Sequence, residues 1–365
     1  MTRLAHVRWR LLLLFVVLVA AACRDRASRA APSEDAPPRA APSRARSPSA
    51  LAAVGSVFAS RGECLRRVEA GERLRRARPG TRLATWNVEW FPDGRPGKRP
   101  KGPGTDVEWL ACAITWLDAD AVAVQEIKRT KRAQEASAAL LRELSRLSGG
   151  EWKLALDECE ITSAQHVGFL WNAKRVRAGP LVMLPSINPH GEPCKDMLRP
   201  GVGLHLRVSP DFDFQFVSLH LKSGTKSRDL ELRKRSWDGL GAALATLEQS
   251  DQDVVIAGDF NTMGCRRCSP SVSSPEELSA LDAALTTLTR VPADAPCSEA
   301  YGSRGTLLDH FLLSRSLRFS GAKSRVSGFC ADSSCRFESR ERPAAENALS
   351  DHCPVVLDLP MKAGD

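Results

Sequence analysis

The sequence predicts an α/β (α+β) domain in which two mixed β-sheets are packed together and flanked by helices. From Thr81 onwards, short apolar runs alternate with amphipathic stretches, as expected for strands and helices. In the second half, several strands follow one another with few helices between them. That order favours a mixed pair of sheets over a doubly wound parallel sheet. The 365 residues are enough for one large domain of this kind.

The expected elements follow from these patterns. Strands are predicted near 81–87, 120–126, 152–156, 166–172, 202–208, 213–221, 253–259, 306–313 and 353–359. Helices are predicted near 105–117, 132–147, 227–249 and 275–289. The 227–249 stretch supports its assignment best, because its leucines and Trp237 fall on one helical face.

The N-terminus carries the features of an export signal. In residues 1–23, Arg3, Arg8 and Arg10 precede an apolar run that is shorter than the roughly 20 residues of a membrane span. The run ends Ala20-Ala21-Ala22-Cys23, which resembles a bacterial lipobox, whose cysteine becomes lipidated. Ala20 stands where leucine is more usual, so secretion without a lipid stays open. We expect either a cell-envelope lipoprotein of the outer membrane or a secreted protein.

The segments that follow explain the basic charge. Residues 24–50 consist mainly of Arg, Ala, Pro and Ser and predict a disordered tether, whereas 51–78 predict a basic helical extension. The first 78 residues carry 16 basic and 6 acidic side chains, so residues 79–365 carry 36 and 37. The net charge of +9 therefore says little about partners of the main domain, which we place at 79–361.

Cysteine usage agrees with export. Without Cys23, ten of the eleven cysteines remain, and an even number in an exported chain favours disulfides. Cys265 and Cys268 have zinc-knuckle spacing, but an oxidising compartment favours disulfides there too. Cys159–Cys194 and Cys330–Cys335 are the suggested pairs, although sequence does not fix connectivity.

Polar residues collect at the predicted C-terminal ends of six apolar strands. A single acid at such a position is usually a turn former or a helix cap. Six ends that carry carboxylates, amides and two histidines point instead to a hard divalent cation, because buried carboxylates need partners. The residues concerned are Asn87, Glu126, His220, Asp259 with Asn261, Asp309, and Asp351 with His352.

The ordered motifs T-W-N-V-E-W, V-Q-E, L-H-L, G-D-F-N, L-D-H and S-D-H resemble the endonuclease/exonuclease/phosphatase superfamily over roughly residues 80–360. The resemblance implies the deoxyribonuclease I-like fold, a four-layer sandwich of two sheets flanked by helices. It also implies metal-dependent hydrolysis of phosphoesters. The segment His220-Leu221-Lys222-Ser223-Gly224 looks most like the secreted bacterial nucleases of this superfamily.

The resemblance assigns metal ligands residue by residue. Glu126 matches the principal ligand of Mg²⁺, with Mn²⁺ or Ca²⁺ as alternatives. Asn87 is a ligand or a phosphate contact, and Asp351 is a ligand or an acid that positions water. Glu89 stands where some members carry a second acid. A magnesium-type ion suits this chemistry because it neutralises the phosphate and retains several waters.

The resemblance also implies the proton-transfer groups. Asp259 and Asn261 match the pair that orients the attacking water and binds phosphate oxygen. His352 matches the catalytic histidine, Asp309 the carboxylate that orients it, and His220 the second histidine. Histidine titrates near working pH, so we expect His352 and His220 to share the roles of acid and base. A serine hydrolase is disfavoured because no nucleophile elbow accompanies Ser350.

Basic residues after four of the motifs favour a polyanionic substrate. The candidate substrate contacts are Asn261, Lys222, Arg129 and Arg266, and the clusters also include Arg95, Lys98, Arg99, Lys101, Lys128, Lys131, Arg132, Lys226, Arg228 and Arg267. The leading hypothesis is a monomeric nuclease for DNA or RNA, without a protein partner and with membrane contact only through its lipid anchor. A phosphatase, a sphingomyelinase-like lipid phosphodiesterase and a catalytically silent binding module are the alternatives. The absence of aromatic residues in 179–200 disfavours the lipid enzyme.

Overall fold

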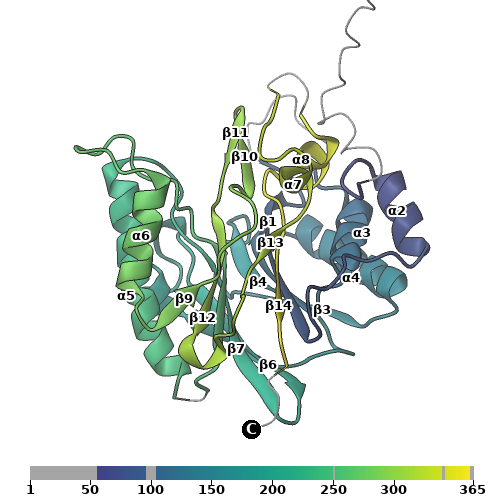
Figure 1. Ribbon diagram of the computed structural model, residues 1–365, viewed down its shortest axis with the longest axis horizontal. Helices are drawn as coiled ribbons and strands as arrows, with labels where there is room; N and C mark the ends of the chain where they lie inside the picture. Colours follow the sequence, from purple (N-terminus) through teal and green to yellow (C-terminus); the bar gives the residue numbers. More distant parts are fainter. Residues whose placement is uncertain (1–55, 96–103, 250, 339–341, 362–365) are drawn as a thin grey trace, which may run out of the picture. The chain divides into compact units, whose positions relative to one another are not determined.

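The structure is a computed structural model that describes residues 56–95, 104–249, 251–338 and 342–361. The predicted export signal (1–23) and tether (24–50) lie outside the described residues, as do Lys98, Arg99 and Lys101. Figure 1 shows two β-sheets at the centre with helices on both outer sides. This four-layer arrangement confirms the predicted fold class.

Two six-stranded sheets contain most of the strands. In spatial order, the first sheet consists of β13 Arg325–Val326, β14 Val355–Leu359, β1 Thr81–Phe91, β2 Ala121–Ile127, β4 His166–Asn172 and β3 Trp152–Leu156. The second consists of β5 Arg177–Leu184, β6 Gly201–Ser209, β7 Phe212–His220, β8 Val254–Asp259, β12 Asp309–Ser314 and β9 Leu288–Arg290. A separate hairpin pairs β10 Glu299–Tyr301 with β11 Arg304–Thr306.

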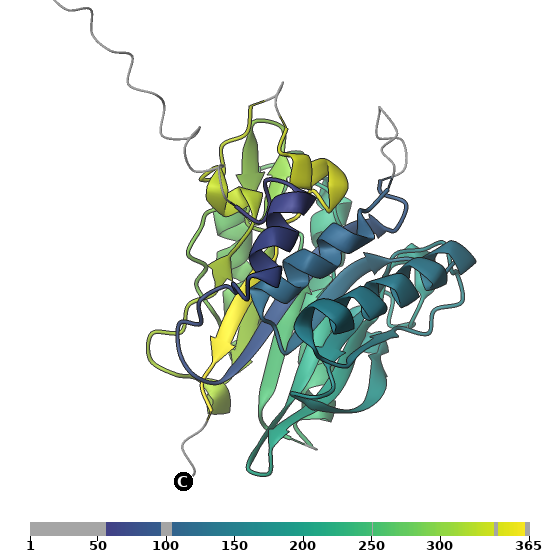
Figure 2. The ribbon, with the colours of Figure 1, turned by 90° about the vertical axis from the view of Figure 1, so that its right-hand side faces the viewer.

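The helices cover the two outer faces (Figures 1 and 2). On the side of the first sheet lie α2 Arg61–Glu69, α3 Val107–Leu117 and α4 Lys131–Ser148, and on the side of the second lie α5 Ser227–Leu247 and α6 Ser274–Ala284. Short helices α7 Phe329–Asp332 and α8 Ala344–Ala348 and the turns η1 Pro185–Ile187, η2 Lys195–Met197 and η3 Arg315–Leu317 complete the described elements. None of the described helices combines the length and apolar composition needed to cross a membrane.

Apolar side chains join these layers. Between the sheets, Phe169 of β4 and Phe216 of β7 bring their ring centroids within 5.1 Å. The predicted apolar face of α5, with Trp237 and Leu240, packs with Val217 of β7 in a second core. Burial on both faces explains why the central strands read as nearly continuous apolar runs in the sequence.

The nine predicted strands and four predicted helices all have counterparts, but some boundaries differ. The strand expected near 306–313 begins only at Asp309, and the helix expected near 275–289 ends at Ala284. Strand β5 was missed because Pro180 interrupts its pattern. Proline is tolerated there because β5 lies at the edge of its sheet, where the pairing with β6 shifts register between Ala178 and Leu181.

The described part of the basic extension packs on the first sheet's helices. Helix α2 begins after the N-cap Ser60 and is joined to α3 by the Cys64–Cys112 disulfide. Upstream of it, Phe58 is buried and packs edge-on against Trp86, with ring centroids 6.3 Å apart. The hydrophobic core therefore includes residues that precede position 79.

The ten cysteines that follow Cys23 form five disulfides. Cys159–Cys194 is confirmed, and Cys265 pairs with Cys268. The suggested Cys330–Cys335 pair is wrong. Instead, Cys330 of α7 bonds Cys353 and Cys335 bonds Cys297, with Cα–Cα distances of 6.1 and 5.8 Å. A disulfide requires such through-space distances, which proximity in sequence does not supply.

The sheet topology gathers the motifs at one edge. Strands β1 and β2 are parallel, as are β7 and β8, so their carboxyl ends meet in pairs. Strands β12 and β14 run antiparallel to their neighbours, so they begin at that edge. The expectation that all six motifs end strands is therefore wrong for Asp309, which opens β12, and for Asp351 and His352, which precede β14.

Candidate active site

A cavity of about 660 Å³ opens at this edge and is lined from both sheets. Its volume lies within the range typical of ligand sites, ~300–1,000 Å³. Eight of the predicted site residues line it, namely Glu89, Glu126, His220, Asp259, Asn261, Arg266, Asp351 and His352. Asn87 and Asp309 are buried beside these residues and hold them in place.

Irregular backbone at the ends of β1 and β2 positions the first acids. Glu126, Glu89 and Trp90 have φ values of 64°, 40° and 54°, in the left-handed region that non-glycine residues seldom adopt. The Glu126 carboxylate accepts hydrogen bonds from the Trp90 N–H and from Asn87 Nδ2, each at 3.1 Å. Such unfavourable conformations cost about 1–3 kcal/mol each and concentrate at functional sites.

Asn87 links the two sheets. Its Nδ2 donates to Glu126 Oε1 and also to Asp259 Oδ2, at 3.1 Å in both cases. Its Oδ1 accepts from the Glu89 N–H at 3.1 Å. A single amide therefore fixes the acid at the end of β2 relative to the acid at the end of β8.

On the second sheet, strand register places three site residues in one row. Asp259 of β8 pairs with His220 of β7 on one side and with Asp309 of β12 on the other. His220 Nε2 lies 3.3 Å from Asp259 Oδ2, and Asp259 Oδ1 accepts from the Asn261 N–H at 2.8 Å. Asn261, with φ of 51°, is held in turn by donation from its Nδ2 to the Leu221 carbonyl.

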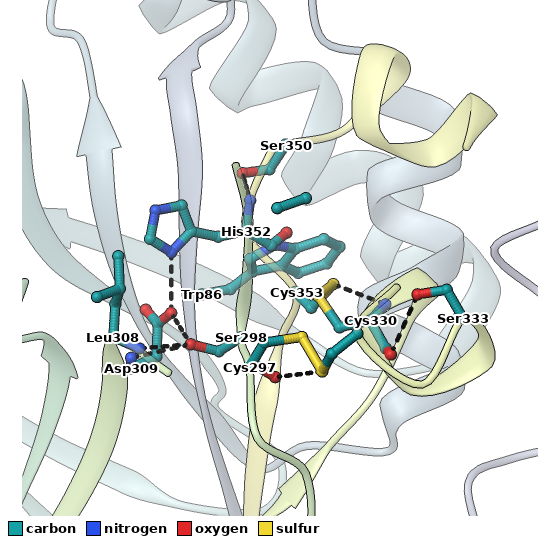
Figure 3. Close-up of a disulfide and its surroundings, with 12 residues drawn as sticks. Trp86, Cys297, Ser298, Leu308, Asp309, Cys330, Ser333, Ser350, His352 and Cys353 are labelled. Carbon is teal, nitrogen blue, oxygen red and sulfur yellow. Dashed lines mark hydrogen bonds and ion pairs between the residues drawn. A yellow bond between two sulfur atoms is a disulfide. The ribbon is translucent and has the colours of Figure 1, made fainter. Parts of the chain in front are cut away.

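His352 and Asp309 form a buried dyad (Figure 3). His352 Nδ1 lies 2.8 Å from Asp309 Oδ2, which also accepts from Ser298 Oγ at 2.7 Å. An ionised carboxylate only accepts, so Nδ1 carries the proton of that bond. Ring nitrogen Nε2 lies 3.8 Å from Asp259 Oδ2 and His352 lines the cavity. The Ser350 hydroxyl further accepts from the His352 N–H at 3.0 Å.

Burial and nearby charges shift the pKa values of His220 and His352 in opposite directions. Burial, followed by the positive charge of Arg199, holds the pKa of His220 well below its usual value. Burial also lowers the pKa of His352, but the carboxylates of Asp309 and Asp259 outweigh it and raise that pKa well above the usual value. His220 is therefore neutral near pH 7, whereas the neighbouring carboxylates favour the protonated form of His352.

Two acids of the cavity, Asp259 and Glu126, have raised pKa values. Burial raises the pKa of Asp259 to about 7, and the nearby Asp309 carboxylate adds to that shift. Burial, followed by the charge of Asp351, raises the pKa of Glu126. Carboxylates with raised pKa values in one cavity identify a place where added positive charge is stabilising.

Comparison with known proteins matches this arrangement to one family. Residues 84–352 match the profile described as the Endonuclease/Exonuclease/phosphatase family. The chain belongs to this family. Members of the family are hydrolases that act on phosphoester bonds, and they typically depend on a divalent metal. No curated protein matches the chain.

Solved structures support the fold. A Bacteroides vulgatus endonuclease/exonuclease/phosphatase matches with a TM-score of 0.52 and 12% identity, over 78% of this chain and 100% of that chain. One from Beutenbergia cavernae matches with a TM-score of 0.52 and 17% identity, over 79% and 73%. A Bacteroides thetaiotaomicron mannosyl-6-phosphatase matches with a TM-score of 0.51 and 15% identity, over 77% and 100%.

The donors in the cavity fit the type of metal that the family uses. Glu126, Asp351 and Glu89 line it with carboxylates, and Asn87 adds an amide. Oxygen donors without thiolates suit a hard cation such as Mg²⁺, which takes one or two carboxylates and keeps several waters. A tighter histidine–carboxylate group, His205, Asp213 and Asp251, has its potential ligand atoms within 4.8 Å of one another, but it lies outside the cavity lining.

Fewer basic residues line the cavity than the sequence predicts. Arg95 and Arg266 line the cavity. Lys222 pairs instead with Asp229 at 3.3 Å, and Lys128 with Asp93 at 2.8 Å. The Arg129 guanidinium donates to the carbonyl oxygens of Asp157 and Cys159, at 3.1 Å each, so it braces a loop outside the cavity lining.

Two residues beside the acids carry no sequence signal. Glu299 of β10 lines the cavity, and burial raises its pKa to about 8. Arg199 precedes β6 and donates from Nη1 to Gln165 Oε1, a cavity residue, at 3.1 Å. An isolated acid in a short hairpin and an arginine before a strand match no motif. Only the fold brings them to the site.

Two other buried histidines, His310 and His166, are structural. His310 is buried and lies 3.0 Å from Thr262 Oγ1, and burial lowers its pKa to about 3. His166 lies 2.7 Å from the Asp157 carboxylate. Neither lines the cavity.

Proposed function

We propose that this chain is an exported, divalent-metal-dependent phosphodiesterase that hydrolyses nucleic acid. The observation that carries the proposal is the His352–Asp309 dyad, which opens onto the same cavity as Asp259 and Glu126. A proton donor beside clustered carboxylates suits the attack of water on an anionic phosphoester.

Each part of the reaction has a residue suited to it. Glu126, Asp351 and Asn87 would hold the divalent cation, with Glu89 beside them, and that cation supplies charge neutralisation for the phosphate. Asp259 and Asn261 orient the attacking water. His352, whose proton-bearing Nδ1 is fixed by Asp309, presents Nε2 for proton transfer to the leaving oxygen. Neutral His220 supplies the second proton-transfer position beside Asp259.

The basic and aromatic side chains that line the cavity favour nucleic acid as the substrate. Proteins that bind single strands combine cationic side chains for the backbone with aromatic faces for the bases. Here Arg95 and Arg266 supply the cations, and Trp90 and Tyr301 supply the aromatic rings. The proposal of export rests on the sequence of residues 1–23, and five disulfides suit an oxidising compartment.

A substrate panel tests the proposal. A chain that begins at residue 24, without the predicted export signal, is incubated with Mg²⁺ and with plasmid DNA, RNA, sphingomyelin or a sugar phosphate. Cleavage of DNA or RNA at the highest kcat/KM is expected. Exclusive release of phosphate from the sugar phosphate, or hydrolysis of sphingomyelin alone, contradicts the nuclease and identifies a phosphatase or a lipid phosphodiesterase.

A further inference from the structure

An exposed aromatic ring stands at the mouth of the catalytic cavity. Tyr301, the sole tyrosine of the sequence, ends β10. It is 66% exposed, yet it lines the cavity that holds His352 and Asp259. A large, solvent-exposed ring that lines a reaction cavity offers a surface on which a flat ligand group stacks.

The hairpin that carries Tyr301 is firmly braced. Ala300 N–H donates to the Asp351 carbonyl at 2.9 Å, and Arg342 Nη1 donates to the Gly302 carbonyl at 2.7 Å. The Cys297–Cys335 disulfide fixes its base. Tyr301 pairs with Arg304 across a two-residue turn, in which Gly302 takes a φ of 65°. The backbone that carries the ring is therefore held in place before a ligand arrives, which lowers the entropy lost on binding.

The strand register relates Tyr301 to the catalytic dyad. Glu299 forms a β-bridge with His352. Side chains two residues apart in a strand point to the same face, and both Glu299 and Tyr301 line the cavity. Glu299 is the residue beside His352, and Tyr301 is the next residue of β10 on the same face. A group attached to a phosphoester bound at His352 would extend toward Tyr301.

The rest of the rim complements this ring. Trp90 lines the cavity too, and its backbone N–H contacts Glu126. Its ring is held by Lys128, whose Nζ lies 5.4 Å from the ring centroid. Arg95 and Arg266 line the cavity as well and add positive charge, with Arg95 Nη1 3.9 Å from Asp351 Oδ2. Cations for phosphates together with an open aromatic face match a chain of nucleotides with unpaired bases.

We propose that Tyr301 is a stacking platform for the nucleobase next to the scissile phosphate, so the preferred substrate is single-stranded nucleic acid. This inference rests on the proposed nuclease function and specifies its substrate class. In a duplex the bases are stacked on one another and turn only their edges outward. An open ring such as that of Tyr301 therefore engages a base only when the base is unpaired.

Two oligonucleotides of equal charge test the proposal. One is a deoxythymidine dodecamer, and the other is an abasic dodecamer with the same phosphate backbone. Tyr301→Ala should raise KM for the thymidine dodecamer by about 5- to 150-fold, the loss expected for one stacked base. Its KM for the abasic dodecamer should stay within about twofold of wild type. Tyr301→Phe should behave as wild type because it keeps the ring.

A matched control uses Ile161→Ala, at an apolar residue that is 47% exposed and lies outside the cavity lining. This variant should change KM for neither dodecamer, and thermal melting should show that all variants are folded. Equal effects of Tyr301→Ala on both dodecamers, or no effect on either, overturn the stacking proposal alone. Failure of the wild-type enzyme to cleave the thymidine dodecamer, RNA and DNA alike overturns the nuclease function and the stacking proposal with it.

Discussion

At the scale of single residues, the site is defined by how each side chain is restrained. Asn87 fixes Glu126 relative to Asp259, and Asp309 fixes the ring orientation of His352 through Nδ1. These contacts join residues far apart in the sequence. The motifs predict which residues meet, because their order and types match one family, but hydrogen-bond partners such as Ser298 emerge only from the fold.

Glu299 gives a pH-dependent prediction at the same scale. Burial raises its pKa from 4.5 to about 8 in the folded protein. Between these values the folded state holds a proton that the unfolded chain releases, so the free energy of unfolding falls as pH rises. Glu299→Gln removes this loss. In EDTA, the free energy of unfolding of the variant should equal that of wild type below pH 4.5. Above pH 8 it should be higher than that of wild type by on the order of a few kcal/mol.

Denaturant midpoints of both proteins at pH 4, 7 and 9, measured in EDTA, check this prediction. The difference in midpoint between Glu299→Gln and wild type should grow between pH 4.5 and about 8 and then stay constant. Midpoints that remain parallel at all three values contradict the assigned shift in pKa.

The residues that the sequence misjudged share a physical cause. Lys222 and Arg129 follow motifs of the active site, but both side chains bind other groups. Lys222 pairs with a neighbouring acid, and Arg129 donates to two backbone carbonyl groups. Long side chains near a site satisfy whichever partner is closest, and sequence does not reveal that partner. No sequence pattern predicts Tyr301 and Glu299 as site residues, because only the folding of a short hairpin brings them to the cavity.

At the scale of elements, two disulfides lie beside the His352–Asp309 dyad (Figure 3). Cys353 directly follows His352 and bonds Cys330, and Cys297 directly precedes Ser298 and bonds Cys335. Ser298 Oγ donates to Asp309 Oδ2 at 2.7 Å. The backbone on both sides of the His352–Asp309 pair is therefore cross-linked to the segment around α7.

Replacement of one such disulfide should reduce turnover as well as stability. Cys297→Ser with Cys335→Ser should lower the free energy of unfolding by about 4 kcal/mol, from the chain entropy of the opened loop. It should also lower kcat, because Ser298 then holds Asp309 less firmly. The matched control is Cys64→Ser with Cys112→Ser, which opens a loop of similar length between α2 and α3. Equal kcat values for the two double variants contradict the positioning role.

The elements also show where sequence patterns are sufficient. For interior strands with continuous apolar runs, such as β2 and β8, and for the amphipathic helix α5, the sequence predicts the bounds within about two residues. Short or edge strands such as β5, β9 and β10 were missed, because few residues and one proline leave no periodicity to detect. Disulfide pairing failed at Cys330 for a related reason, since pairing depends on how those segments fold back.

At the scale of the whole molecule, the N-terminal segment predicts where the protein acts. If Cys23 is lipidated, Cys23→Ser should move the protein from the membrane fraction to the soluble fraction of the cell envelope. Its kcat should not change, because the described residues that line the catalytic cavity come from positions 89 to 352. Fractionation followed by immunoblotting checks the prediction. Equal distribution of both proteins contradicts the lipid anchor and favours simple secretion.

The central claim is that the cavity is a metal-dependent phosphoesterase site. The most direct measurement is the rate at which the chain from residue 24 hydrolyses the deoxythymidine dodecamer with Mg²⁺, with EDTA, and for His352→Ala with Mg²⁺. We predict hydrolysis that EDTA abolishes and that His352→Ala slows by about 10²- to 10⁴-fold, the usual contribution of a general acid or base, without a change in melting temperature of more than a few degrees. Hydrolysis that survives EDTA, or an undiminished rate in a folded His352→Ala protein, would contradict the account.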